Sequence, residues 1–143
     1  MNANTKTVEM KDRKVILSAL WIFAMFNYLY ADVFTLFFNP AAHQETLALS
    51  QTAVLAFAIM METAIAMVIL SRFLPYRANR WANMIAGLFY TALVAWSSTG
   101  SAQPLFYLMF AGIEIACTLF ITWFAWQWRN PEGQPVSQPI PVN

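Results

Sequence analysis

Four long apolar runs, separated by short polar connections, dominate this sequence. They cover residues 15–38, 47–70, 81–98 and 104–128. Each is roughly 20 residues long, which is the length a helix needs to cross a hydrocarbon core of about 30 Å. Only 10% of the 143 residues are charged, whereas about a quarter are charged in an ordinary soluble domain. The sequence therefore predicts an all-α integral membrane protein, a bundle of four transmembrane helices.

The two halves of this bundle share a weak internal similarity. Aligning the runs matches six pairs of identical residues: Trp21 with Trp81, Tyr30 with Tyr90, Gln51 with Gln103, Glu62 with Glu114, Ala64 with Ala116 and Ile69 with Ile121. Both halves would enter the membrane from the same side. The pattern is consistent with two parallel helical-hairpin repeats related by an axis along the membrane normal.

All lysines and arginines lie on one side of the predicted bundle. They precede the first run, separate the second from the third, and follow the fourth: Lys6, Lys11, Arg13, Lys14, Arg72, Arg77, Arg80 and Arg129. Because basic segments stay in the cytoplasm, both termini are expected there, with the protein in a bacterial inner membrane. Residues 1–14 would form a cytoplasmic arm, 15–128 the transmembrane domain, and 129–143 a disordered, proline-rich cytoplasmic tail.

Several function classes find no support in the composition. A net charge of +1 and the lack of a basic stripe argue against nucleic acid as a partner. The single Cys117 cannot form an intrachain disulfide, and the single His43 cannot supply two haem ligands. No cofactor-binding motif, metal-ligand set or catalytic group can be assigned, so an enzyme is the less favoured reading.

Three carboxylic acids inside the runs are the most informative polar residues: Asp32, Glu62 and Glu114. Glu62 and Glu114 fall about 20 and 15 Å below the outer starts of their helices, and Asp32 falls in the outer third of the first. No lysine, arginine or histidine lies in any run to neutralise them. The acids are therefore protonated, share protons as a coupled set, or hold a cation that exchanges.

Other polar residues share the helix faces of these acids. Asn27 and Tyr28 lie close to Asp32 on the first run, and Tyr90 belongs to a polar stripe on the third. We expect the stripes to enclose a pocket with Glu62 and Glu114 at its centre. Asp32, Asn27, Tyr28 and Tyr90 would line its outer half.

Three functions remain open at this stage. The first is binding or transport of a small cationic or amphipathic ligand, or of protons, in the acidic pocket. The second is a non-catalytic accessory or scaffold subunit, in which the acids only join helices by hydrogen bonds. The third is an intramembrane isomerase or quinone-linked enzyme that uses an acid for proton transfer. Four helices expose most of their surface to membrane lipids, and the alanines of residues 47–70 offer a packing face, so a homo-oligomer is expected.

The first run also carries a family resemblance. The stretch from Asn27 to Asp32, reading NYLYAD, with Trp21 to Phe23 before it, resembles the opening helix of a bacterial family of small four-helix membrane proteins of unknown function. The layout is similar, more loosely, to DoxX-like four-helix proteins, some of which are linked to quinone-reducing respiratory modules. Neither resemblance implies a role for any individual residue.

Overall fold

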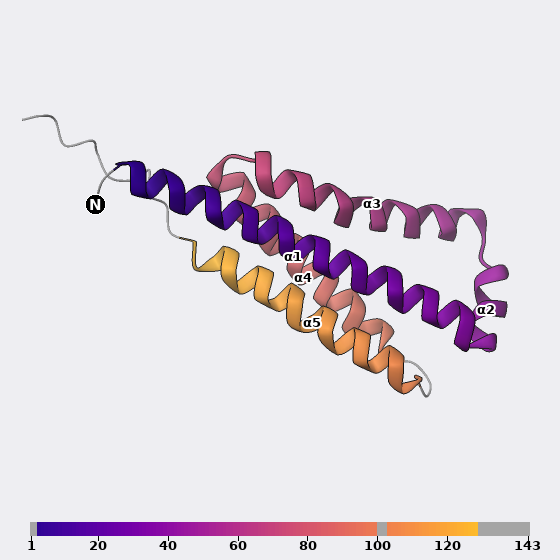
Figure 1. Ribbon diagram of the computed structural model, residues 1–143. Coiled ribbons are helices and arrows are strands. Elements are labelled where there is room, and N and C mark those ends of the chain that lie inside the picture. The colour runs from indigo at the N-terminus through magenta and orange to yellow at the C-terminus, as the bar shows by residue number, and fades with distance from the viewer. Residues whose placement is uncertain (1–2, 100–102, 129–143) are drawn as a thin grey trace, which may run out of the picture.

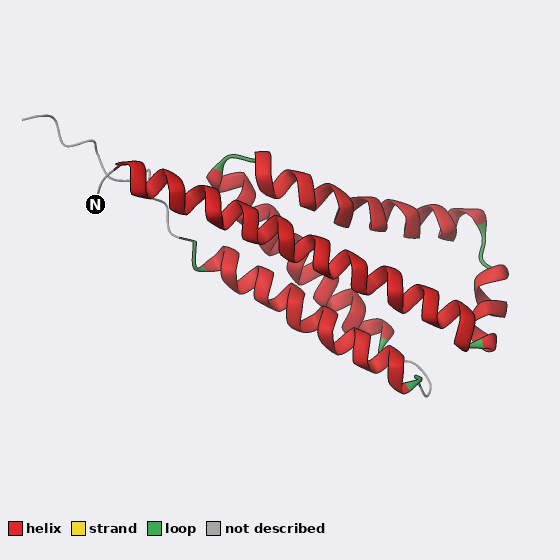
Figure 2. Ribbon diagram, in the orientation of Figure 1, coloured by secondary structure: helices red, strands yellow, loops and turns green. Residues whose placement is uncertain are grey.

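The computed structural model describes residues 3–99 and 103–128, and this part of the chain is built of α-helices joined by short connections (Figure 2). The helices are α1 (Ala3–Phe38), α2 (Pro40–Leu47), α3 (Gln51–Phe73), α4 (Tyr76–Ser97) and α5 (Leu105–Trp126). The predicted all-α class is confirmed. The predicted tail, 129–143, lies outside the described residues.

Several helix boundaries differ from their predicted places, two of them because a side chain caps the helix. The Ser50 hydroxyl accepts a hydrogen bond from the Ala53 amide at 3.2 Å, so α3 begins at residue 51 rather than 47. Asn39 caps α2 in the same way, which makes a short helix of a segment expected to be a loop. α4 starts directly after Pro75, five residues before the predicted run. The predicted arm is helical from Ala3 and continuous with the first span.

Three helices are long and apolar enough to cross a membrane: Lys11–Phe38 within α1, α3 and α5. α4 has a similar length, but its first two turns contain two arginines and two asparagines. These polar residues make α4 less apolar than the other three. Length and composition therefore support three of the four predicted spans directly.

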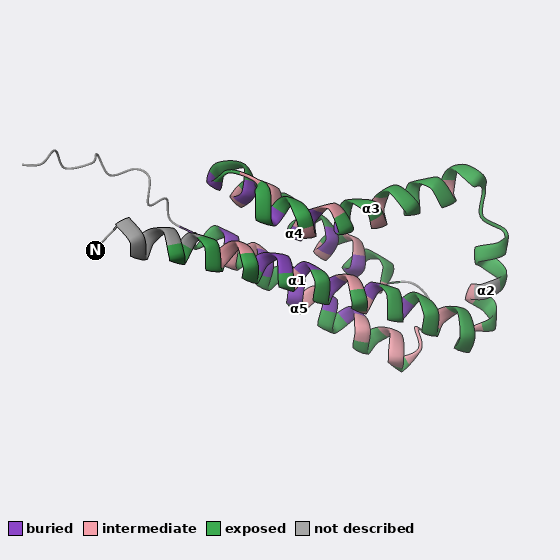
Figure 3. Cartoon of the chain, turned by 45° about the horizontal axis from the view of Figure 1, so that its top comes forward, coloured by how far each residue is buried: buried purple, intermediate pink, exposed green. Residues whose placement is uncertain are grey.

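The helices form a bundle that is closed at one end and splayed at the other. α1 lies between α3 and α5, and α4 packs along α5 (Figure 1). The buried residues of α3 are Ala64, Met67 and Ser71, all in its second half. Its first half is almost wholly exposed and runs apart from the other helices toward α2 (Figure 3). The residues that line a cavity lie along this splayed half of α3 and the facing parts of α1, α4 and α5, and we call this region the wedge.

A buried polar cluster joins α1, α3 and α4 at the closed end. The side-chain oxygen of Asn83, Oδ1, accepts hydrogen bonds from Trp21 Nε1 at 2.7 Å and from the Ser71 hydroxyl at 3.1 Å. The Asn83 amide donates to Asn79 Oδ1 at 2.6 Å, and Asn79 in turn donates to the Ser71 carbonyl at 2.6 Å. All four side chains are fully buried. Because each buried polar group has a partner, the cluster fixes the three helices relative to one another.

α4 and α5 approach each other closely at Gly87. A Cβ atom placed there would lie 3.0 Å from the Thr118 carbonyl oxygen and would overlap the Thr122 side chain. One turn along, the hydroxyls of Thr91 and Thr118 lie 2.7 Å apart and share a hydrogen bond. Small residues and hydroxyls join helices in this way in membrane proteins, where lipid offers no hydrophobic driving force.

The described basic side chains gather at the closed end. Lys14 Nζ at the start of the apolar part of α1 donates to the Leu74 carbonyl at 2.7 Å. Arg80 donates to the Trp126 carbonyl at 3.2 Å. The first turns of the span, the α3–α4 connection and the end of α5 therefore meet at one end, as the charge pattern predicts.

The residues paired in the proposed internal repeat occupy different surroundings. Trp21, Tyr90 and Glu114 are buried, whereas their counterparts Trp81, Tyr30 and Glu62 are exposed. The first hairpin is also splayed, while the second is tightly packed. The repeat stays a prediction, and any common ancestry of the hairpins no longer implies common roles for these residues.

Candidate ligand pocket

The wedge beside α1 holds a cavity of about 600 Å³ to which all five helices contribute. Most of its wall is apolar, formed by side chains such as Leu36, Leu49, Phe57, Met61 and Leu93. Concave and mostly apolar sites with a few convergent polar groups are the usual form of small-molecule sites. The cavity has the size and the lining expected of one.

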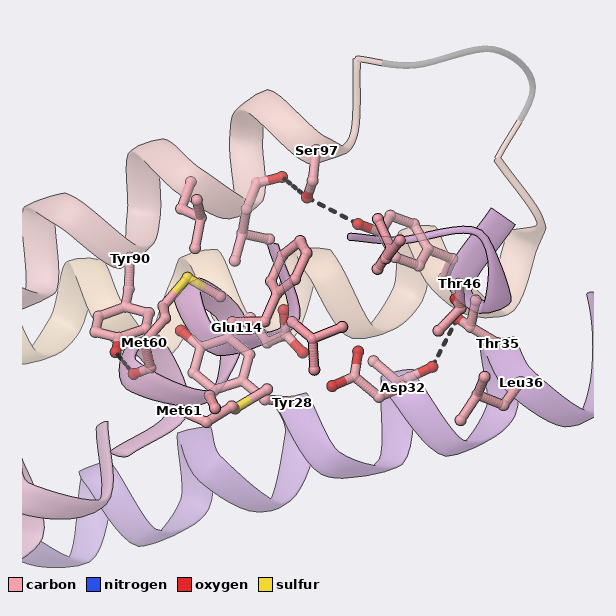
Figure 4. A pocket seen from close by; sticks show the side chains of 18 residues that line it. Tyr28, Asp32, Thr35, Leu36, Thr46, Met60, Met61, Tyr90, Ser97 and Glu114 are labelled. Atoms are coloured by element: carbon pink, nitrogen blue, oxygen red, sulfur yellow. Dashed lines mark hydrogen bonds between the residues drawn. The ribbon is translucent and has the colours of Figure 1, made fainter. Parts of the chain in front are cut away.

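Two acids and a tyrosine supply the polar part of the wall. Asp32 comes from α1 and Glu114 from α5, and Tyr28 lies one turn before Asp32. Figure 4 shows the three side chains along one stretch of the cavity wall. The cavity therefore carries two carboxyl groups in one polar patch.

Part of this patch has no hydrogen-bond partner in the described chain. Glu114 is only 4% exposed and its Oε1 atom is unpaired, as is the buried hydroxyl of Tyr28. Asp32 is exposed at the cavity wall, and its carboxyl makes no hydrogen bond to another described residue. Buried polar atoms are nearly always paired, so each unpaired one needs an explanation, such as a water, an ion or a ligand bound in the cavity.

The other polar groups of the wall are satisfied within the protein. The Tyr90 hydroxyl donates to the Met60 carbonyl of α3. The Tyr107 hydroxyl donates to Ser97 Oγ at 2.8 Å, and Thr35 donates to the Ala31 carbonyl at 2.7 Å. The unpaired atoms are therefore concentrated at Tyr28, Asp32 and Glu114.

Two aromatic rings of the cavity lining, Tyr28 and Tyr90, pack against each other, and Tyr90 also packs against Trp21. The Tyr28 and Tyr90 rings lie 5.6 Å apart, and Tyr90 meets Trp21 edge to face at the same centroid distance. Trp21 is bonded to Asn83 of the buried polar cluster. The rings therefore connect the cavity lining to the buried polar cluster.

The structure brings together four of the six predicted site residues. Tyr28, Asp32, Tyr90 and Glu114 line the cavity. Asn27 does not, and its amide donates instead to the Phe23 carbonyl of its own helix at 2.9 Å. Glu62, which was expected at the centre, is exposed on α3 and does not line the cavity either.

Sequence reasoning missed much of the apolar wall and Ser97. Tyr107 lies seven residues before Glu114 on the same helix face, which the sequence indicates, but it was not among the predicted site residues. Ser97 gives no such signal, since it ends its helix. Leu49 and Thr46 come from the connection around α2, whose path is not encoded in helical periodicity.

Within the described residues, no three histidine, cysteine, aspartate or glutamate side chains come together in a way that could hold a metal ion. The chemistry that the wall offers is that of two carboxyls, a phenol and two aromatic faces. These groups can bind protons or a cation, and the apolar wall can bind a hydrocarbon part.

A comparison with known protein families decides the relationship of the chain. A family model described as a family of unknown function (DUF6326) matches residues 6–134. The chain belongs to this family. The match confirms the resemblance to a family of unknown function, while the likeness to DoxX-like proteins stays a prediction. No curated protein and no solved structure matches the chain, so the function of this DUF6326 member has to be argued from its own cavity.

Proposed function

We propose that this protein is a bacterial inner-membrane protein that binds a small amphipathic ligand with a cationic head in the acidic cavity, as a binding protein or transporter. In this proposal α4 forms a fourth span beside α5, and both termini lie in the cytoplasm. The observation that carries it is the pair of unpaired buried atoms, Glu114 Oε1 and the Tyr28 hydroxyl, beside the Asp32 carboxyl.

The electrostatics favour a cation. An ionised acid near the middle of a membrane costs about 2.5–3.5 kcal/mol on insertion scales. The apolar runs 15–38, 47–70, 81–98 and 104–128 contain no lysine or arginine that could offset this cost at Asp32 or Glu114. A bound ammonium group would neutralise one carboxyl, and the faces of Tyr28 and Tyr90 would add cation–π attraction. The apolar wall would take up the hydrocarbon part of the ligand.

The alternative of purely structural acids fits the geometry less well. A carboxyl that joins helices structurally has to form a hydrogen bond with a polar group on a neighbouring helix. In the described chain, the carboxyls of Asp32, Glu62 and Glu114 make no hydrogen bond or ion pair to another helix. The helices are instead joined by asparagine, serine, threonine and tyrosine side chains. The hydrogen bonds that join the helices therefore do not involve the acids.

The test is binding of tetraphenylphosphonium, a permanently charged apolar cation, to the full chain in lipid nanodiscs. We expect Glu114→Gln to weaken binding at least about tenfold, because it removes the buried one of the two cavity carboxylates. Glu62→Gln is the matched control, since it removes a carboxyl from the same membrane but outside the cavity. It should change affinity by less than about twofold.

The pH dependence gives a second readout. Protons and the cation compete for the same carboxyls, so binding should weaken as the pH falls in the wild type. The charge of the probe does not change with pH, so the effect belongs to the protein. Glu114→Gln should flatten the dependence. Equal affinities of wild type and Glu114→Gln with unchanged pH profiles would refute the proposal.

A further inference from the structure

Glu62 occupies an unusual place for a carboxylic acid. It lies eleven residues from each end of α3, Gln51 and Phe73, which is about 16 Å of helix in either direction. The side chain is too short to reach either membrane surface from there. It is exposed, and it makes no ion pair within the described chain. An acid in this position would face the lipid core of the membrane.

The surrounding face of α3 is turned away from the bundle. Leu55, Ile59 and Ile69 share this face by helical periodicity, and their side chains are 59%, 60% and 58% exposed. The buried side of α3, with Ala64 and Met67, lies on the opposite side of the helix. We call the face of Leu55, Ile59, Glu62 and Ile69 the outer face of α3.

Leaving this face in lipid would be costly. A carboxyl at the helix centre is disfavoured by about 2.5–3.5 kcal/mol even on the mildest scale, unless it finds a polar partner. Ala66 lies one turn after Glu62, and its small side chain allows another helix to come close. A polar group flanked by a small residue on an otherwise apolar face is the pattern of a helix–helix contact.

A second copy of the same chain is the occupant that this face fits. A protonated carboxyl both donates and accepts hydrogen bonds, so it is complementary to an identical carboxyl. A two-fold axis along the membrane normal places the same residue of each copy at the same depth. The one-sided lysines and arginines favour a single orientation for all copies, which this symmetry requires.

We infer that two copies of the chain pair through the outer faces of α3, with the two Glu62 carboxyls hydrogen-bonded to each other at the centre of the membrane. The interface lies on the side of α3 opposite its buried residues and is separate from the cavity acids. It does not depend on the proposed function, because Asp32 and Glu114 take no part in it.

Crosslinking in native membranes tests the arrangement. Cysteines are placed in a Cys117→Ala background at Ile59 on the outer face of α3, and at Leu88 as a control. Leu88 is 53% exposed near the middle of α4, on a helix outside the inferred interface. A short bis-maleimide should join two copies through Ile59→Cys and not through Leu88→Cys. Absence of crosslinked dimer at position 59, or equal crosslinking at both positions, would overturn the inference.

The role of Glu62 is tested by the dimerisation constant of the full chain in liposomes. Glu62→Leu should weaken the dimer by roughly threefold to thirtyfold, the range that interhelical hydrogen bonds provide. Glu62→Gln should keep it, because an amide also both donates and accepts. Tryptophan fluorescence checks that the variants are folded. A dimerisation constant that is unchanged in Glu62→Leu contradicts the inference. So does a wild-type protein that stays monomeric and binds a lipid, if Glu62→Leu no longer binds it.

Discussion

At the scale of single residues, hydrogen bonding separates two kinds of buried polar side chain in this bundle. Asn83 is fully buried and satisfied by Trp21, Ser71 and Asn79. Glu114 is nearly as buried, yet one of its oxygens is unpaired. The first arrangement stabilises the fold and the second leaves room for a ligand. Hydropathy alone gives no means of telling them apart.

We expect Asn83→Leu to lower the free energy of unfolding by about 1–3 kcal/mol, because Trp21 Nε1 loses its buried acceptor. Denaturation by sodium dodecyl sulfate in mixed micelles measures the change. Asn27→Leu is the control, since Asn27 bonds only to the Phe23 carbonyl of its own helix. It should cost less than about 1 kcal/mol. A larger loss in Asn27→Leu than in Asn83→Leu would show that the cluster contributes little.

At the scale of helices, the two hairpins differ in how closely their members approach. Gly87 lets α4 reach the backbone of α5, whereas the first half of α3 stands away from α1 and leaves the cavity. The Tyr90 hydroxyl holds the Met60 carbonyl at the point where α3 begins to diverge. The tight hairpin therefore serves as the rigid wall of the cavity, and α3 forms its looser wall.

Two glycine-to-alanine substitutions distinguish the effect of close helix packing on stability from the effect of helix propensity. Gly87→Ala should lower the melting temperature, because overpacking costs about 1–3 kcal/mol, more than the roughly 1 kcal/mol that alanine gains in a helix. Gly112→Ala on α5 should raise it slightly, because a Cβ atom there has no neighbour within 4 Å. Thermal denaturation in one detergent compares both with the wild type. Equal shifts of the same sign would contradict the close approach at Gly87.

At the scale of the whole molecule, the described basic side chains and the cavity lie at opposite ends of the bundle. The described basic side chains contact the closed end of the bundle, while the cavity lies toward α2 at the other end. If the basic end is cytoplasmic, the cavity occupies the outer half of the membrane, where a ligand would enter from the outer side.

Labelling of single cysteines in intact bacterial cells tests this orientation. In a Cys117→Ala background, an impermeant maleimide should label Gln44→Cys on α2 and should not label Arg77→Cys at the basic end. Both positions are exposed, so both should react once the cells are permeabilised. Labelling of Arg77→Cys in intact cells would mean that the protein is inserted the other way round.

The sequence by itself determined that the chain is helical and roughly where most of its long helices run. It also determined which connecting segments are basic and which acids lie inside apolar runs. These properties depend on the length and polarity of segments, which can be counted along the chain. Four of the six expected site residues, among them Asp32 and Glu114, also followed from their helix faces.

Only the tertiary structure decided which of the acids meet. Glu62 and Glu114 have similar positions within apolar helices, yet one faces outward and the other faces the cavity. In a membrane helix both faces are apolar, so hydropathy does not fix the rotation of the helix about its own axis or its tilt. Contacts between distant segments fix them, such as Tyr90 with Met60 and Trp21 with Asn83. These contacts depend on side-chain shape and hydrogen bonding across the bundle, which no single segment contains.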